Sequence, residues 1–194
     1  EIIQAYESYQ FHHIYHRLHN FCSLELGGFY LDIIKDRQYT AAANSKARRS
    51  AQTAMYHIIQ ALSRWIAPIL SHTAEEIWEH IPCEKLSSVF LSEWYAGFDI
   101  EDLANIDFKM NSNFWQEIME VRTAVYREIE NQRNSGNIRS SLDAQVTLFA
   151  SPRLHRILSE LGDELRFVLI TSDVTVLPLS EVDEEAHKTE LEEL

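Results

Sequence analysis

The chain has 194 residues, enough for one large domain or two small ones, and 45% of them are apolar, which allows a sizeable core. Five glycines and four prolines are too few for a turn-rich all-β fold or a glycine-rich phosphate loop. A net charge of −13 excludes attraction of nucleic acid or membrane to the protein as a whole, so such binding requires a local basic surface.

Targeting signals are not evident in the sequence. No apolar run approaches the roughly 20 residues that cross a bilayer, and the N-terminus EIIQAYESYQ lacks the basic start and apolar core of a signal peptide. Cys22 and Cys83 lie far apart, which suits a reducing compartment better than a disulfide framework. We therefore expect a cytoplasmic protein with no membrane partner.

The N-terminal segment is predicted to be helical. Over residues 3–35 apolar side chains recur at spacings of three and four, with a break near 8–10. Gly27 and Gly28 weaken an exposed helix, and a close approach to another helix would compensate for this cost.

The clearest helix covers residues 45–70, with a continuous apolar stripe. Ser45 is the expected cap, and Pro68 is expected to end or kink the helix. The next segment, SHTAEEIWEHIP, is predicted to be a helix capped by Ser71 or Thr73.

In the second half of the chain the spacing of apolar residues changes from helical to strand-like. Residues 83–110 are predicted to be mostly loop, and 111–132 a helix with one apolar face. AQVTLFA (144–150) alternates as a strand, SPRLHRILSELG is a short helix, and a second strand is expected near 174–177.

These elements predict a mainly α fold. A helical bundle covers 1–135, a small α+β module covers 136–180, and an acidic tail or linker covers 181–194. The tail holds seven carboxylates and one lysine, so it is expected to be solvated.

The segment HHIYHRLH has several histidines at helical spacing, which is one feature of a metal site. His12, His16 and His19 can share one helix face, but no nearby cysteine or carboxylate completes an obvious ligand set. We favour a polar helix face and predict no metal site, while a metal-binding bundle stays an alternative.

Catalytic groups are not indicated either. The carboxylate pairs Asp32/Asp36 and Glu75/Glu76 are explained by solvated surface pairing, and no nucleophile motif occurs. We predict no catalytic residue in this chain.

Basic residues gather in one stretch despite the acidic total. Between 35 and 49 there is a single acid, Asp36. Amides at the start of the following helix would also face an anion, so either a phosphate or a salt bridge to a neighbouring helix explains these cations. The basic residues of this stretch are Lys35, Arg37, Lys46, Arg48 and Arg49.

A second basic stretch is NQRNSGNIRSS (131–141). It places Arg133 and Arg139 among amides without an acid, which suits RNA backbone and base edges as well as a plain exposed loop.

Several longer stretches resemble a known family. FYLDIIKDRQYT, SKARRSAQTAMYHIIQALSRWIAPILSHTAEEIWEHIP and SVFLSEWY are similar, in order and spacing, to the anticodon-binding domain of bacterial isoleucyl-tRNA synthetases. SSLDAQVTLFA and GDELRFVLITS resemble the small α+β module that follows it. APILSHTAEEIW fits a pattern shared with valyl- and leucyl-tRNA synthetases, and FYLDIIKDRQYT favours the isoleucine enzyme.

The resemblance implies a function in tRNA binding. The bundle would receive the anticodon stem-loop of isoleucine tRNA, while ATP and Mg act in a separate catalytic domain and zinc binds in a further C-terminal segment. KMNSN (109–113) lacks the second lysine of the KMSKS loop, and no HIGH-like partner accompanies it. The expected partners are therefore tRNA and the catalytic and C-terminal domains of the same polypeptide.

The residues expected to bind tRNA follow from the basic stretches and this resemblance. The cations would hold phosphates, Tyr39 or Asn44 would contact a base, and Asp32, Asp36 and Arg37 would tie helices together. Two alternatives stay open: an architectural domain that packs on the rest of its synthetase, and a valyl-type specificity. The full set is Lys35, Arg37, Tyr39, Asn44, Lys46, Arg48, Arg49, Arg133 and Arg139.

Overall fold

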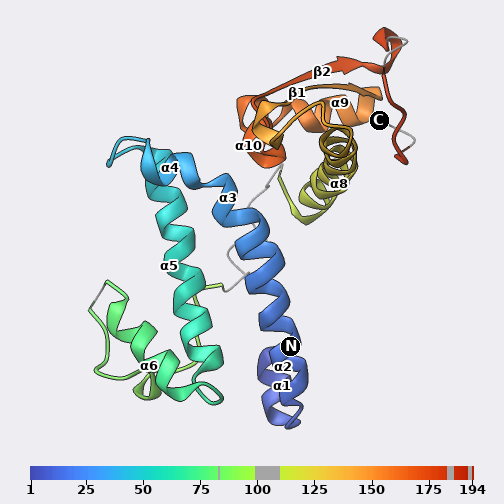
Figure 1. The fold of residues 1–194 in the computed structure, drawn as a ribbon. Helices are drawn as coiled ribbons and strands as arrows, with labels where there is room; N and C mark the ends of the chain where they lie inside the picture. Colours follow the sequence, from blue (N-terminus) through green and yellow to red (C-terminus); the bar gives the residue numbers. More distant parts are fainter. Residues whose placement is uncertain (83, 99–109, 183–185, 192–193) are drawn as a thin grey trace. The chain divides into compact units, whose positions relative to one another are not determined.

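The computed structural model describes residues 1–82, 84–98, 110–182, 186–191 and 194 (Figure 1). The chain divides into two compact units, Glu1–Asp107 and Phe108–Leu194. The predicted fold class, mainly α with a small α/β part, is confirmed. Within the described ranges, no helix has the length and apolar character of a membrane span.

The first unit begins with a helical segment that breaks where the sequence predicts. Tyr9 adopts a left-handed backbone with φ of 55°, an uncommon conformation for a non-glycine residue that ends the first helix. The segment consists of α1 (Ile2–Glu7), α2 (Phe11–Asn20), a π-helix (Phe21–Tyr30) and α3 (Leu31–Ile33).

The π-helix explains the two glycines. A Cβ atom on Gly27 would lie 2.9 Å from the carbonyl oxygen of Cys22, and one on Gly28 would lie 3.3 Å from that of Ser23. Both oxygens belong to the residue five positions earlier, which is the spacing of a π-helical turn. Glycine thus fits the wide turn of its own helix. The predicted close approach of another helix is wrong, because no described atom of a neighbouring helix lies within 4 Å of either Cβ position.

Two helices joined by a short loop follow. α4 (Lys35–Tyr39) packs against the N-terminal end of α5 (Lys46–Ile66) (Figure 1). The Ser45 hydroxyl accepts a hydrogen bond from the amide of Arg48 at 3.2 Å, so the predicted cap is confirmed. α5 ends at Ile66, two residues before Pro68, as predicted.

α6 (Ser71–His80) begins without the predicted side-chain cap. Ser71 lies inside the helix and donates to the carbonyl of Ala67 at 3.0 Å, so its hydroxyl faces the preceding turn and not the free amides. The expected cap at Ser71 or Thr73 is therefore wrong.

α6 instead anchors the chain that returns along it, which includes a 3₁₀ turn at Val89–Leu91. The Glu75 carboxylate accepts from the hydroxyl of Ser88 at 3.0 Å and from the amide of Val89 at 3.1 Å. The indole N–H of Trp78 donates to the carbonyl of Leu86 at 2.8 Å. Glu75 and Trp78 both belong to the EEIW part of the segment APILSHTAEEIW, so this part of the sequence has a structural role here. The buried cluster around it is Ala67, Ala74, Trp78, Ile81 and Val89.

The second unit is a small α/β module. β1 and β2 pair in parallel, from Gln145 opposite Asp173 to Ala150 opposite Pro178. The hydroxyl of Ser151 caps the helix between them, with Pro152 as its first residue. The elements are α8 (Ser112–Asn134), β1 (Gln145–Ala150), α9 (Pro152–Ser159), α10 (Leu165–Leu169) and β2 (Asp173–Pro178), with 3₁₀ turns at Ser141–Asp143, Gly162–Glu164 and Leu179–Glu181.

α8 belongs to this second unit. The compact units divide at 107/108, whereas the sequence placed the end of the bundle at 135. α8 buries one apolar face within the module, and Arg122 donates from Nε to the carbonyl of Val168 on α10 at 3.2 Å. Periodicity predicted this face, but it does not specify the element that covers it. The face consists of Phe114, Ile118, Val121, Val125 and Ile129.

Candidate nucleic-acid interface

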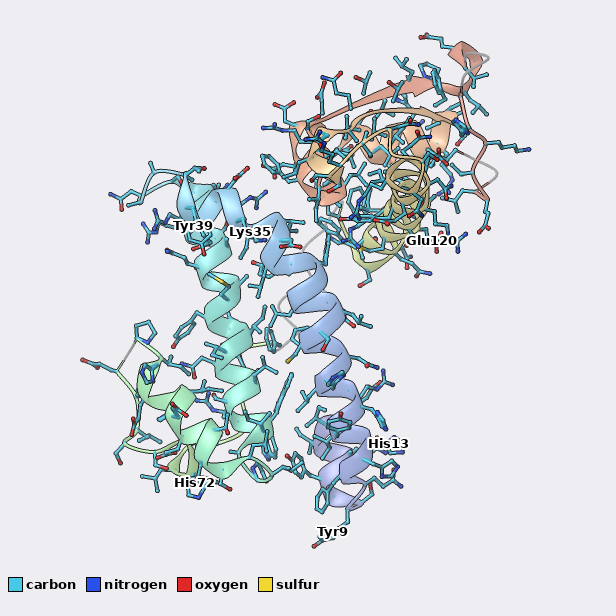
Figure 2. All side chains as sticks on the ribbon, viewed as in Figure 1. Tyr9, His13, Lys35, Tyr39, His72 and Glu120 are labelled. Carbon is cyan, nitrogen blue, oxygen red and sulfur yellow. The ribbon has the colours of Figure 1, made fainter. Side chains whose placement is uncertain are left out.

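The basic residues of the first stretch gather at one end of the first unit. α4, the loop that follows it and the first turn of α5 form a corner that carries all seven candidates between residues 35 and 49. Lys35 and Tyr39 mark this end in Figure 2. We call residues 35–49 the α4–α5 corner.

Lys35 is engaged by an acid on the neighbouring turn. Its ammonium group lies 2.5 Å from the carboxylate of Asp32, and both side chains are partly exposed. This hydrogen bond, together with the negative charge of Asp32, raises the pKa of Lys35. Its charge is thus partly neutralised within the protein.

Arg37 acts electrostatically on the tyrosine at the end of the π-helix. Burial raises the pKa of the Tyr30 hydroxyl, and the positive charge of Arg37 opposes that rise. Arg37 is half-buried. The role expected for Arg37 in tying helices together stays a prediction.

Arg48 also turns into the protein. Its Nη1 donates to the carbonyl of Ala41 at 3.2 Å, across the loop that leads into α5. Its Nε is buried and has no hydrogen-bond partner among the described residues. Of the three cations in the first turn of α5, only Arg48 is half-buried.

The other candidates of the corner point to solvent. Lys46 and Arg49 are exposed, and no ion pair is found for either in the part of the chain that the structure describes. Asn44 is exposed in the loop, and Tyr39 exposes 84% of its surface. Two unpaired cations therefore lie in the same corner as an exposed amide and an exposed aromatic ring.

Cations at this position oppose the helix dipole. The first turn of a helix carries partial positive charge, so Lys46 and Arg49 are unfavourable there unless an anion approaches. Free amides at a helix N-terminus and nearby cations together form a suitable site for a phosphate group.

The second basic stretch lies in the other unit. Arg133, in the last turn of α8, pairs with Glu130 at 2.5 Å. Arg139 is exposed in the loop that follows, where Gly136 has a φ of 77°. Both arginines thus belong to the second unit, and of these two only Arg139 has no ion pair among the described residues.

The histidines of α2 do not assemble into a ligand set. The rings of His12 and His13 lie 4.1 Å apart, while His16 and His19 each contact the ring of Tyr15. Within the described ranges, no group of three histidine, cysteine or carboxylate side chains could hold a metal ion. The geometry gives the metal-binding alternative no support.

The KMNSN segment has a structural role in its described part. The side chain of Asn111 accepts from the amide of Phe114 at 3.0 Å and so caps α8. Lys109 lies outside the described residues.

Sequence reasoning missed an apolar groove beside the corner. Arg49 lies at its edge, and side chains of the π-helix, α3 and α5 form its walls. Residues more than 20 positions apart make these walls, so no local pattern indicates the groove. The apolar lining includes Leu26, Leu31, Met55, Ile59 and Leu62.

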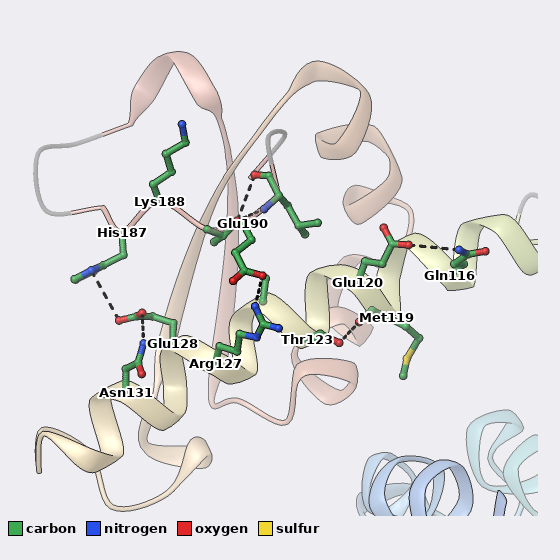
Figure 3. A pocket seen from close by; sticks show the side chains of 13 residues that line it. Gln116, Met119, Glu120, Thr123, Arg127, Glu128, Asn131, His187, Lys188 and Glu190 are labelled. Carbon is green, nitrogen blue, oxygen red and sulfur yellow. Dashed lines mark hydrogen bonds and ion pairs between the residues drawn. The ribbon is translucent and has the colours of Figure 1, made fainter. Parts of the chain in front are cut away.

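A second hollow lies in the other unit, where the acidic tail runs along α8 (Figure 3). Arg127 on α8 forms an ion pair with Glu190 of the tail, and His187 lies 4.0 Å from Glu128. Hydrogen bonds from Gln132 and Asn131, together with His187, lower the pKa of Glu128 against the opposing effect of burial. These carboxylates make the hollow unsuitable for a phosphate backbone.

Comparison with known proteins identifies the family. The sequence model described as the anticodon-binding domain of tRNA ligase matches residues 1–148. The chain belongs to this family. The match covers the whole first unit with α8 and most of β1 of the second, so the anticodon-binding domain family extends across both compact units.

Three similar proteins carry the same name. The chain is 52% identical over 194 residues to an isoleucine–tRNA ligase of Marinomonas sp. (strain MWYL1), covering 100% of this chain. It is 53% identical over 192 residues to that of Methylococcus capsulatus and 54% identical over 193 residues to that of Stutzerimonas stutzeri, each covering 98% of this chain. The chain spans 20% of the length of these relatives. The resemblance seen in the sequence is confirmed.

Proposed function

We propose that the chain binds the anticodon stem-loop of isoleucine tRNA through the α4–α5 corner. The observation that supports this most strongly is the pair of exposed cations Lys46 and Arg49 in the same corner as the exposed ring of Tyr39. Lysine and arginine would hold phosphates and set the register, while Tyr39 stacks on an unpaired base and Asn44 reads a base edge. Membership of the anticodon-binding family supports the same partner.

The local charge makes such binding compatible with an acidic chain. Residues 35–49 carry five cations and one acid, although the chain has a net charge of −13. Interactions between exposed charges are screened beyond roughly 10 Å in 0.1 M salt, so distant carboxylates weaken the attraction only slightly. Arg139 in the second unit is a further candidate for a phosphate contact, and Arg133 a weaker one because it already pairs with Glu130.

The names of the relatives extend the proposal to a larger enzyme. The chain would act as part of a cytoplasmic isoleucine–tRNA ligase, in which the catalytic residues, ATP and Mg belong to another domain and zinc to a C-terminal segment. Its other partners would then be those domains of the same polypeptide.

A second candidate function rests on a separate group of side chains. The rings of Tyr9, Phe11, Tyr6 and Trp94 contact one another in series, and Tyr9 exposes 80% of its surface. An exposed aromatic surface of this kind suits packing against protein. It favours an architectural domain whose main partner is the rest of its synthetase.

Binding of the chain to two tRNAs separates the two functions. One is unmodified isoleucine tRNA, and the other is the same tRNA with an altered anticodon. We expect tighter binding of the unaltered molecule at moderate salt, because base-edge contacts discriminate and phosphate contacts do not. Weak and equal binding of both tRNAs would contradict anticodon reading and favour the architectural function.

A further inference from the structure

We propose that Arg48 is a positioning residue: it clamps the loop of residues 40–45, so that Asn44 is held ready for a base, and does not itself bind phosphate. The inference rests on the proposed function and deepens it. It assigns different tasks to two arginines that are adjacent in the sequence, Arg48 and Arg49.

Arg48 closes the loop from both of its ends. Its Nη1 donates to the carbonyl of Ala41 at the start of the loop, at 3.2 Å, and its amide donates to the hydroxyl of Ser45 at the end, also at 3.2 Å. Between these points the amide of Ser45 donates to the carbonyl of Ala42 at 2.9 Å. The side chain of Arg48 therefore holds the start of the segment that carries Asn44, while its backbone amide meets the Ser45 cap at the end.

The loop is also fixed to α4. The amide of Ala41 donates to the carbonyl of Asp36 at 3.1 Å, and both the amide and the hydroxyl of Thr40 donate to the same carbonyl, at 2.9 and 2.7 Å. The Ala41 carbonyl that Arg48 binds thus belongs to a residue already anchored to the helix. Because of this arrangement, the clamp connects α5 with α4 through the loop.

The burial of Nε on Arg48 disfavours a bidentate phosphate contact through that nitrogen. Its Nε has less than 1 Å² of exposed surface, so this face of the guanidinium does not reach solvent without a change of rotamer. Phosphate recognition by arginine uses parallel N–H donors of the planar group. Arg49 is exposed and lies one position further along α5, so it is the arginine that can make this contact.

A clamped loop has a specific advantage for reading a base. Ordering a flexible loop on binding lowers affinity, and a loop that is already held avoids that loss. Asn44 would then present its amide to a base edge in a fixed geometry, which discriminates between bases. Loss of the clamp should therefore affect the choice of anticodon more than the electrostatic attraction.

The test compares Arg48→Ala with the charge-matched control Arg49→Ala. Amide hydrogen exchange of residues 41–45 is measured in the free chain, and affinity for the two tRNAs is measured across a salt series. We expect Arg48→Ala to accelerate exchange in the loop and to reduce the preference for the isoleucine anticodon to near unity, with an unchanged salt slope. Arg49→Ala should keep loop exchange and preference, and lower the salt slope by roughly 0.7–0.9.

A second variant loosens the loop at its other end, at the helix cap, without removing a charge. Ser45→Ala deletes the acceptor at the end of the loop and leaves both arginines, so it should also accelerate exchange and reduce the anticodon preference. If Arg48→Ala proves too unstable to study, Arg48→Lys, which keeps the charge and loses the planar guanidinium, takes its place with the same expected result.

The proposal is overturned if Arg48→Ala lowers the salt slope as much as Arg49→Ala while loop exchange and preference stay unchanged. If the unaltered chain shows no anticodon preference, the proposed function fails and the exchange measurement alone decides on the clamp. Faster exchange in Arg48→Ala would then support it, and unchanged exchange would overturn it.

Discussion

The two ends of α5 carry arginines in opposite situations. Near the C-terminal end, Arg64 donates to the carbonyl of Glu93 at 2.9 Å and to the carbonyl of Gln60 at 2.7 Å, and its guanidinium lies 4.6 Å from the centre of the Trp78 ring. At the N-terminal end, Arg49 is exposed and has no ion pair among the described residues. The same residue type therefore stabilises the fold at one end of the helix and is available for a partner at the other.

This difference cannot be seen in composition or periodicity. Arg64 is satisfied by the carbonyl of Glu93 in the segment that returns past α6, by the carbonyl of Gln60 on its own helix, and by the ring of Trp78 on α6. Arg49 lies in the helical turn where positive charge is least favourable. A cation kept in an unfavourable position without a partner is a better indicator of ligand binding than the number of basic residues.

The largest expected effect concerns the core beneath the C-terminal end. Trp78 is 2% exposed and donates to the carbonyl of Leu86, so Trp78→Ala removes packing and a hydrogen bond together. We expect the free energy of unfolding of the first unit to fall by about 3–5 kcal/mol, measured by chemical denaturation. Trp94→Ala, in the same unit at a position that is 41% exposed, is the matched control and should cost clearly less. Equal losses would contradict the assignment of Trp78 to the core.

A smaller effect tests the two arginines directly. Arg64→Ala should lower the free energy of unfolding by about 1–2 kcal/mol, because its hydrogen bonds to carbonyls and its contact with Trp78 are lost. Arg49→Ala should change it by no more than about 0.5 kcal/mol. The comparison of the two ends breaks down if both variants lose the same stability in the same denaturation experiment.

The smallest effect concerns the cation that already has a partner. Asp32→Asn should lower the pKa of Lys35 toward its ordinary value, since the hydrogen bond and the charge of Asp32 raise it. The folded state raises this pKa, so the pair stabilises the fold at neutral pH, and this contribution is lost only as pH rises through the pKa of Lys35, above 10.5. An NMR titration of the Lys35 side chain measures the change. Asp36→Asn should move this pKa less, and an unchanged Lys35 pKa in Asp32→Asn would exclude the pairing.

Much of the fold could be predicted because its signals are local. The Ser45 cap and Pro68 bound α5, and alternation of apolar residues marks β1. The π-helix could not be predicted, because its wider turn differs from an α-helix in hydrogen bonding and not in composition. The unit to which α8 belongs could not be predicted either, since an apolar face does not specify its partner.

The candidate site was predicted as a set of residues but not as an arrangement. Local charge identified the α4–α5 corner, and the structure separates its members by direction. Arg48 turns inward to Ala41 and Lys35 pairs with Asp32, whereas Lys46 and Arg49 face solvent. The direction of Arg48 depends on the carbonyl of Ala41, and that of Lys35 on the carboxylate of Asp32. A pattern of basic residues in the sequence contains neither group.

The measurement that tests the central claim most directly is the salt dependence of tRNA binding by two charge-matched double variants. One combines Lys46→Ala with Arg49→Ala at the corner. The other combines Arg17→Ala with Arg156→Ala at exposed positions elsewhere, and so removes the same two charges. If the corner holds phosphates, only the first lowers the slope of log K against log salt, by roughly 0.7–0.9 for each lost contact. Equal slopes for the two variants would contradict the assignment of the α4–α5 corner as the tRNA-binding surface.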